Sequence, residues 1–264
     1  MILEQILRDK KKEVARLKSR KPLAALKLES ARMPKRKNRF LSALKKKRGI
    51  AVIAEIKRRS PSKGLLRRDF NAVKIARQYQ KAGAAALSVL TDKKYFGGSA
   101  DILKKVRRAV PLPILRKDFT VDEYQLYESR LLGADAVLFI ARVLSRAQMR
   151  RFGALARKLG LEVLFEVHDG ADLKKVAPLK PRLVGINNRD LDSFRVDLNV
   201  TKRLAKKVPG RCLIVSESGI SGAHELAELK RSGVKAVLVG ETLMKDKDPG
   251  RALKRLLGKT HGSR

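Results

Sequence analysis

The chain has 264 residues, 63 of them Lys or Arg and 26 Asp or Glu, which gives a net charge of +37, and 44% of its residues are hydrophobic. This length suits one large α/β core, and the sequence contains no apolar run of about 18 residues that would cross a membrane. Since the charged N-terminus also lacks the apolar stretch of a secretory signal, we expect a cytoplasmic protein.

Residues 1–48 are expected to form a basic helical extension that packs on the rest of the chain. Apolar residues between Ile2 and Leu17 recur with mostly helical spacing, and a second short helix is expected over about 37–47. Residues 20–36, which contain Pro22 and Pro34, are interpreted as a connecting stretch.

From residue 49 to residue 264 the pattern predicts a (βα)8 TIM barrel. Short apolar runs alternate with amphipathic basic segments, several of which end at a glycine, as helices commonly do. A doubly wound open sheet is the alternative, but it predicts ligands at one switch point, whereas here polar residues follow most of the strands. The expected strands are 51–56, 85–90, 112–116, 135–140, 161–167, 182–187, 212–217 and 235–239.

Charged and amide side chains stand near the ends of separate predicted strands. In a parallel barrel these ends meet at one mouth, where the active site of this fold lies. A partly desolvated cluster of carboxylates and ammonium groups there can tune a lysine toward acid catalysis, although peripheral salt bridging is the simpler interpretation. The residues concerned are Glu55, Lys57, Lys117, Glu166, Asn187 and Glu217.

The last two strands predict a phosphate site. Ser218 and Gly219 follow the seventh strand, and Gly240 and Glu241 follow the eighth. Loops in these positions often bind phosphate through backbone N–H groups, although both could be simple turns. After the first strand, the segment AEIKRRSPSKG (54–64), which includes Ser60, is expected to be a mobile loop over the site.

Other chemistry finds little support in the sequence. Cys212 is the one cysteine, which excludes an internal disulfide, and the three histidines lack metal-ligand spacing. The segment LKRLLGKT (253–260) has leucine where a P-loop needs glycine, and no GxGxxG occurs. We therefore expect neither a metal nor a cofactor.

Eight motifs in order make the whole chain resemble the indole-3-glycerol phosphate synthase family. They are AEIKRRSPSKG, SVLTDKKYFGGS (88–99), LRKDFTVDEYQ (115–125), ADAVLFIA (134–141), VLFEVHD (163–169), GINNRDLDSFRVDL (185–198), VSESGI (215–220) and AVLVGETLM (236–244). The resemblance implies a carboxy-lyase of tryptophan biosynthesis that acts on 1-(2-carboxyphenylamino)-1-deoxyribulose 5-phosphate. Closure of the indole ring, loss of carbon dioxide and loss of water would need no cofactor.

The resemblance also implies roles for the residues at the mouth. Lys117 is similar to the general acid that protonates the substrate ketone, and Lys57 to a lysine that engages the substrate carboxylate. Glu166 is similar to the base of the dehydration step, with Glu55 as a second candidate. The remaining residues are Asn187 and Glu217 for orientation, Ser60 and Arg189 for the carboxylate, and Ser218, Gly219, Gly240 and Glu241 for the phosphate. Glu241 departs from family members that have serine, and its side chain should point away from a phosphate.

Two other functions compete with this interpretation. A different phosphate-binding barrel, such as phosphoribosylanthranilate isomerase, would use a cysteine near a strand end, but Cys212 lies at the start of a strand. A nucleic-acid-binding protein has only the +37 charge in its favour, and no RNA-recognition signature accompanies that charge. We expect a solvated basic surface with non-specific polyanion binding, and a monomer because like charges repel.

Overall fold

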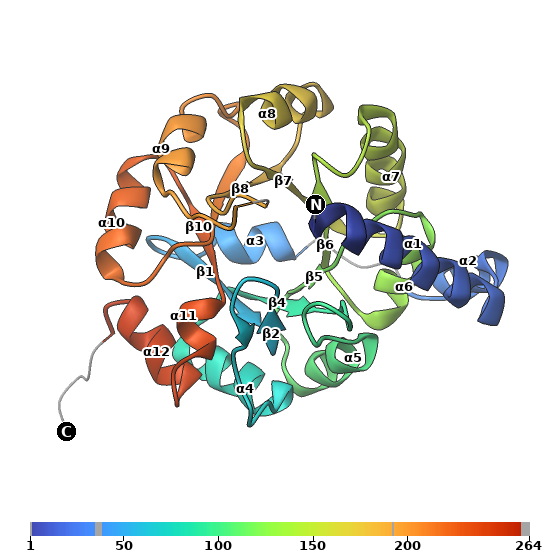
Figure 1. The fold of residues 1–264 in the computed structure, drawn as a ribbon, viewed down its shortest axis with the longest axis horizontal. Helices are drawn as coiled ribbons and strands as arrows, with labels where there is room; N and C mark the ends of the chain where they lie inside the picture. The colour runs from blue at the N-terminus through green and yellow to red at the C-terminus, as the bar shows by residue number, and fades with distance from the viewer. Residues whose placement is uncertain (1, 35–38, 192, 260–264) are drawn as a thin grey trace.

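The structure, a computed structural model, describes residues 2–34, 39–191 and 193–259. Within these residues eight parallel strands close into a barrel in the order β1–β10–β9–β8–β7–β6–β5–β4, with helices around it (Figure 1). The predicted (βα)8 class is confirmed, and the doubly wound sheet is wrong. The barrel strands are β1 (Ala51–Ile56), β4 (Ala86–Leu90), β5 (Ile114–Lys117), β6 (Ala136–Ile140), β7 (Glu162–Val167), β8 (Leu183–Asn187), β9 (Leu213–Glu217) and β10 (Ala236–Val239).

The segment after β1 is partly ordered as a small hairpin. Strands β2 (Arg59–Ser60) and β3 (Gly64–Leu65) pair antiparallel, with Arg59 opposite Leu65. The turn between them contains Pro61, which lacks a backbone N–H, and Gly64 adopts a left-handed φ of 64°. The sequence predicted a loop here, and the structure adds a short ladder within it.

The barrel helices begin and end where their sequence signals lie. Ser99 accepts a hydrogen bond from the N–H of Ile102, and Gly83 and Gly133 end two helices with φ of 97° and 87°, as predicted. The helices are α4 (Ala72–Ala82), α5 (Ala100–Ala109), α6 (Tyr124–Leu132), α7 (Arg146–Lys158), α8 (Gly170–Val176), η1 (Ala177–Leu179), α9 (Asn199–Ala205), α10 (Ala223–Arg231), α11 (Glu241–Met244) and α12 (Pro249–Leu256).

The N-terminal segment contains a helix that the sequence analysis missed. Helices α1 (Ile2–Arg20) and α3 (Phe40–Lys45) match the two expected ones, although residues 37–38 of the second lie outside the described residues. The expected connecting stretch 20–36 instead holds α2 (Leu23–Ala31). Pro22 precedes α2 at its N-cap, where proline costs no hydrogen bond, and Leu26 is buried in a cluster with Tyr124 of α6.

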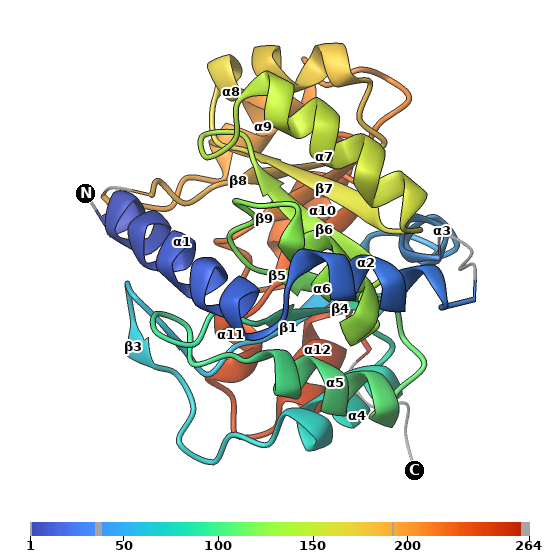
Figure 2. The same ribbon diagram turned by 90° about the vertical axis from the view of Figure 1, so that its right-hand side faces the viewer.

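The barrel has two differently covered ends. Phe40, Leu41 and Leu44 of α3 are buried with apolar side chains of the barrel interior and close the end where the strands begin. Helix α1 lies at the opposite end, as Figure 2 shows from the side. A separate apolar layer joins the outer faces of the strands to the surrounding helices. Among the described helices, none combines the length and apolar character that a bilayer crossing needs.

Candidate active site

One cavity of about 610 Å³ opens at the carboxyl ends of the barrel strands. Every residue that the sequence predicted for the site lines it. Six lie at or directly after strand ends and six in the segments that follow: Glu55, Lys57, Lys117, Glu166, Asn187 and Glu217, and then Ser60, Arg189, Ser218, Gly219, Gly240 and Glu241. Residues up to 186 positions apart in the sequence therefore share one site, because parallel strands deliver their last side chains to the same end of the barrel.

Lys117 lies at the centre of the polar part of the cavity. Its Nζ atom is 2.9 Å from Oε2 of Glu166 and 2.7 Å from Oε2 of Glu217. The two carboxylates are 2% and 1% exposed and are hidden from bulk water, whereas the Lys117 side chain is 15% exposed. Close, desolvated pairs of this kind hold a charged group in a fixed position, at the cost of removing it from solvent.

The pKa values of this cluster are set by burial and by neighbouring charge. Burial opposes the ammonium of Lys117, but Glu166 and Glu217 outweigh it and raise the Lys117 pKa. Burial, with the repulsion of Glu166, raises the Glu217 pKa to about 7, whereas Lys117 and His168 hold the Glu166 pKa below its usual value. The sequence suggested a lysine tuned toward neutral pH; here the carboxylates keep Lys117 protonated, and Glu217 is the group that titrates near neutrality.

A second ion pair lies at the carboxyl end of β1. Nζ of Lys57 is 2.7 Å from Oε1 of Glu55, and Ser88 donates to the other carboxylate oxygen at 3.4 Å. Despite burial, Lys57 and then Lys117 lower the pKa of Glu55. A Cβ atom at Gly240 would stand 2.3 Å from Oε1 of Glu55, so the missing side chain at this position makes room for the carboxylate.

Asn187 links the charged cluster around Lys117 to the turn after β9. Its Nδ2 donates to Oε1 of Glu166 at 3.3 Å, and its Oδ1 accepts from Ser218 Oγ at 2.9 Å. Ser218 has a left-handed φ of 68°, which is unusual for serine, and Asn188 Nδ2 supports it by donating to its carbonyl at 3.1 Å. This network fixes the backbone at the start of the predicted phosphate turn.

Glu241 occupies the turn after β10 and is matched by two cations. Its Oε2 is 3.0 Å from Nη2 of Arg189, and its Oε1 is 2.7 Å from Nζ of Lys245. Although burial opposes it, these neighbours lower the pKa of Glu241. Arg189, which was expected near the substrate carboxylate, is therefore placed beside the predicted phosphate turn.

Sequence reasoning missed the apolar part of the cavity. Ile2, Leu3 and Ile6 of α1 line it, together with Phe96 and Phe119, whose ring centroids are 6.1 Å apart. The helical spacing of the α1 residues predicted a buried face but not what it covers. Within the described residues, no three or more His, Cys, Asp and Glu side chains are grouped as metal ligands.

His168 is a further polar residue that the sequence did not single out. It is 7% exposed, and its Nε2 lies 3.3 Å from Oε1 of Glu166, while its Nδ1 lies 3.5 Å from Oδ2 of Asp172. Burial opposes its charge, but the two carboxylates raise its pKa to about 9. His168 therefore adds positive charge behind Glu166.

Comparisons with known proteins agree with the resemblance seen in the sequence. A family model described as indole-3-glycerol phosphate synthase matches residues 3–256. The chain is 48% identical to a protein of that name from Polaromonas sp. over 97% of this chain and 98% of the relative, and 46% identical to one from Thermoanaerobacter pseudethanolicus over 93% of both.

Solved structures with much lower identity share the fold. A 3-hexulose-6-phosphate synthase matches with a TM-score of 0.64 at 16% identity, over 80% of this chain and all of that one. A thiamine phosphate pyrophosphorylase from Pyrococcus furiosus matches with a TM-score of 0.61 at 16% identity, over 80% of this chain and 95% of that one.

Proposed function

The chain belongs to the indole-3-glycerol phosphate synthase family and is an enzyme of tryptophan biosynthesis, and we propose how the residues of its barrel mouth divide the reaction. The substrate is 1-(2-carboxyphenylamino)-1-deoxyribulose 5-phosphate. An aromatic carbon attacks the substrate ketone, carbon dioxide is lost from that ring carbon, and water leaves to complete the indole.

Lys117 is the acid of the ring closure. Attack on the ketone builds negative charge on its oxygen, and a fixed, partly buried ammonium is well suited to stabilise and protonate that oxygen. The observation that carries this assignment is the pair of contacts from Lys117 to Glu166 and Glu217, which aims a protonated group into the cavity. Because the Glu217 pKa is about 7, this carboxyl can hold a proton at neutral pH and return it to Lys117.

The second half of the reaction needs a base and an acid to remove water. Glu166 is the proposed base, and Glu55 the second candidate, since both are buried carboxylates in the same cavity. Lys57, held 2.7 Å from Glu55, binds the substrate carboxylate and can act as the acid that protonates the leaving hydroxyl. Asn187 and Glu217 orient the substrate and the lysines, and Ser60 assists at the carboxylate.

The phosphate is proposed to bind between the turns after β9 and β10. Ser218 and Gly219 supply one side, and Gly240 and Glu241 begin the short helix α11 on the other. Arg189 and Lys245 offset the carboxylate of Glu241 and add positive charge near this position. A bound phosphate would orient the ribulose chain so that its ketone faces Lys117.

The test is formation of the fluorescent indole product from the anthranilate-derived ribulose phosphate. The purified parent chain should turn this substrate over without added metal or cofactor, and the product should show the expected mass. No product at any enzyme concentration would overturn the assignment. Isomerisation of phosphoribosylanthranilate instead would favour the alternative barrel enzyme, although Cys212 precedes β9 at the opposite end of the barrel from this cavity.

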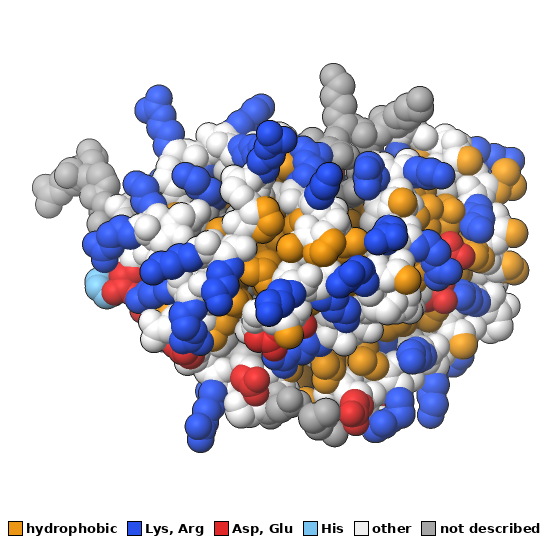
Figure 3. All heavy atoms as spheres, turned by 90° about the horizontal axis from the view of Figure 1, so that it is seen from above, with side chains coloured by type: hydrophobic (Ala, Val, Ile, Leu, Met, Phe, Trp, Pro, Cys, Tyr) orange, Lys and Arg blue, Asp and Glu red, His pale blue; other side chains and the backbone are white. Residues whose placement is uncertain are grey.

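The basic surface is proposed to bind polyanions without specificity. Lys and Arg side chains are spread over the whole face seen in Figure 3, with few acidic neighbours and no single basic patch. Binding to RNA should be weak and should vanish by physiological salt, as expected for counterion release alone. Sequence-specific binding that persists at that salt concentration would instead indicate a dedicated partner. The cytoplasmic location and the monomeric state stay predictions from composition and charge.

A further inference from the structure

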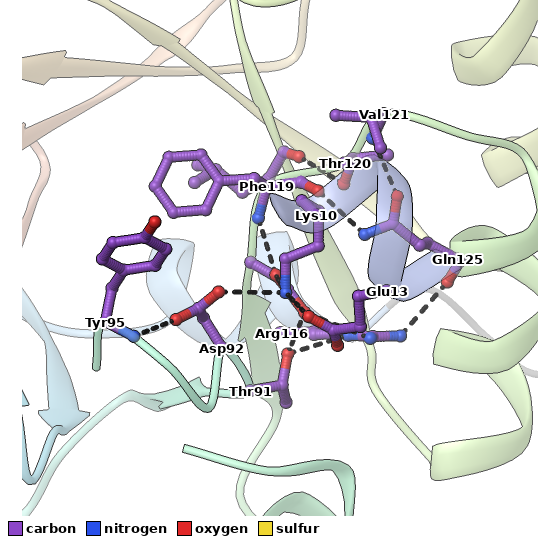
Figure 4. Close-up of polar contacts among 12 residues, drawn as sticks. Lys10, Glu13, Thr91, Asp92, Tyr95, Arg116, Phe119, Thr120, Val121 and Gln125 are labelled. Carbon is purple, nitrogen blue, oxygen red and sulfur yellow. Dashed lines mark hydrogen bonds and ion pairs between the residues drawn. The ribbon is translucent and has the colours of Figure 1, made fainter. Parts of the chain in front are cut away.

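Lys10 of helix α1 is buried against the carboxyl ends of the barrel strands β4 and β5. Lys10 is 1% exposed, and its Nζ lies 2.9 Å from Oδ1 of Asp118, 3.0 Å from Oδ2 of Asp92 and 2.9 Å from Oε2 of Glu13 (Figure 4). Its neighbours Lys11 and Lys12 are exposed. In a chain with 63 basic residues, a lysine whose ammonium is buried among three carboxylates differs from the solvated surface lysines.

The two aspartates belong to the strand ends beside Lys117. Asp118 follows Lys117 directly, and Asp92 lies two residues beyond β4. Oδ1 of Asp118 accepts the N–H of Phe119 at 2.8 Å, and Oδ1 of Asp92 accepts the N–H of Tyr95 at 2.8 Å. The carboxylates that bind Lys10 therefore also shape the loops after β4 and β5.

A second buried cation completes this group on the barrel side. Nη2 of Arg116 is 3.2 Å from Oδ2 of Asp118 and 2.7 Å from Oε2 of Glu128. Burial opposes the charge of Asp118, but Lys10 first and Arg116 second lower its pKa. Without Lys10, Asp92 would lose its buried cation, and Asp118 would keep only Arg116 of its two. A buried carboxylate without a cation is unstable unless it gains a water molecule or a proton.

The same face of α1 reaches the cavity. Leu3 and Ile6 precede Lys10 by seven and four residues, which places the three side chains on one side of the helix, and both apolar residues line the cavity. Further contacts tie α1 to the same loops, because Asp9 pairs with Lys94 at 2.7 Å and Lys18 pairs with Asp122 at 2.6 Å. Of these ties, the Lys10 contact is the buried one.

We propose that Lys10 is a positioning residue for ring closure. By binding Asp92 and Asp118 at once, it holds α1 across the ends of β4 and β5. It thereby fixes both the backbone that carries Lys117 and the apolar wall that α1 adds to the cavity. This inference rests on the function proposed above for Lys117.

Three variants test the proposal. Lys10→Met keeps most of the apolar stem and removes the charge, and Lys11→Met is the matched control on the exposed face of the same helix. Lys10→Met combined with Asp92→Asn restores the charge balance of the buried group without restoring the link. Each variant is compared with the parent by thermal unfolding, by kcat and KM in the indole-product assay, and by hydrogen exchange of the backbone amides.

The positioning role predicts a specific pattern. In Lys10→Met, kcat should fall about tenfold or more because small displacements of an acid are costly. The α1 amides should exchange about tenfold faster while those of β7, β8 and β9 stay protected. Lys11→Met should match the parent. The double variant should regain thermal stability relative to Lys10→Met, but its kcat should stay low.

Several results would overturn the proposal. A folded Lys10→Met with parent kcat would do so, as would recovery of kcat together with stability in the double variant, which would make Lys10 a charge-balancing residue only. Failure of both variants to fold would also overturn it, because α1 would then serve folding rather than positioning. If the parent itself forms no indole product, the proposed function fails, while the exchange of α1 still decides whether Lys10 holds this helix.

Discussion

Nζ of Lys117 lies 2.7 Å from Oε2 of Glu217, although their strands stand on opposite sides of the barrel. Three strands separate β5 from β9 in either direction around the barrel. The two side chains therefore meet across the barrel mouth, because β5 and β9 are not neighbouring strands. The contact makes the position of the proposed acid depend on both halves of the barrel.

Replacement of Lys117 by alanine should abolish turnover and leave the fold intact. The variant removes the ammonium that would stabilise the substrate oxyanion, so kcat should fall by about 10³-fold or more. The fold should survive because Glu217, whose pKa is already about 7, can take up a proton when its partner is lost. Indole-product fluorescence and circular dichroism measure the two effects. Lys158→Ala, at an exposed lysine at the end of α7, is the control, and near-parent kcat in Lys117→Ala would remove Lys117 as the acid.

Replacement of Glu166 by glutamine should slow turnover by about 10²-fold or more, since an amide cannot act as a base. The new side chain keeps a similar shape and can still face Asn187, so KM should change little. Single-turnover kinetics would show whether an intermediate accumulates before dehydration. Parent kinetics in this variant would leave Glu55 as the base, and Glu55→Gln would then show the larger loss.

Replacement of Gly185 by alanine should weaken catalysis without replacing any ionisable residue. A Cβ atom here would stand 2.1 Å from Oε1 of Glu217, so the carboxylate must leave its present position beside Lys117. We expect kcat to fall about tenfold or more. The control is Gly153→Ala on α7, where a Cβ atom meets nothing within 4 Å. Equal activity of both variants would show that the exact position of Glu217 is unimportant.

The strands and the polar mouth could be predicted because their signals are local. Apolar runs mark buried parallel strands, and the fold then dictates that residues such as Glu55 and Asn187 share one end of the barrel. Predicted and observed strands agree within two residues at each end. The largest difference is at the start of β5, which begins at Ile114 and not at residue 112. This strand ends on Lys117, so the charged residue that indicated the strand end is the last residue of the strand.

What could not be predicted depends on long-range packing. The apolar spacing of α1 predicted a helix but not which end of the barrel the helix covers. The placement of the helix depends on the burial of Lys10, and the sequence does not distinguish a buried lysine from the many exposed ones. Helix α2 was missed because Pro22 suggests a break, whereas in the structure it directly precedes the first turn. The raised Lys117 pKa follows from distances that only the folded barrel sets.

Stability should fall as the pH rises above neutrality because of His168. Its pKa is raised from 6.5 to about 9, so the folded state binds this proton more tightly than the unfolded state. The resulting stabilisation is complete below about pH 6.5 and is lost as the pH rises through 9, and it amounts to about 3 kcal/mol at most. The raised pKa of Glu217 likewise makes the unfolding free energy fall as the pH rises, here between pH 4.5 and about 7.

Urea unfolding at pH 6, 7.5 and 9 measures this dependence. The unfolding free energy should fall by about 1 kcal/mol at each of the two pH steps. His168→Asn should flatten the curve above pH 6.5, and His224→Asn, at an exposed histidine, should leave it unchanged. An unaltered slope in His168→Asn would show that the contacts to Glu166 and Asp172 do not hold a proton on this ring.

Replacement of Glu241 by serine should tighten binding of the phosphorylated substrate. The carboxylate now lies 3.0 Å from Nη2 of Arg189 and 2.7 Å from Nζ of Lys245, so both cations are engaged before a phosphate arrives. Serine removes the negative charge, frees the two cations and adds a hydroxyl donor at the start of α11. We expect KM to fall about threefold to tenfold with little change in kcat, since the phosphate is remote from the reacting ketone.

Glu241→Gln separates the loss of charge from the change in size and should give a smaller decrease in KM. Inhibition by inorganic phosphate should strengthen in parallel. An unchanged KM together with unchanged phosphate inhibition would place the phosphate elsewhere in the cavity, away from Arg189.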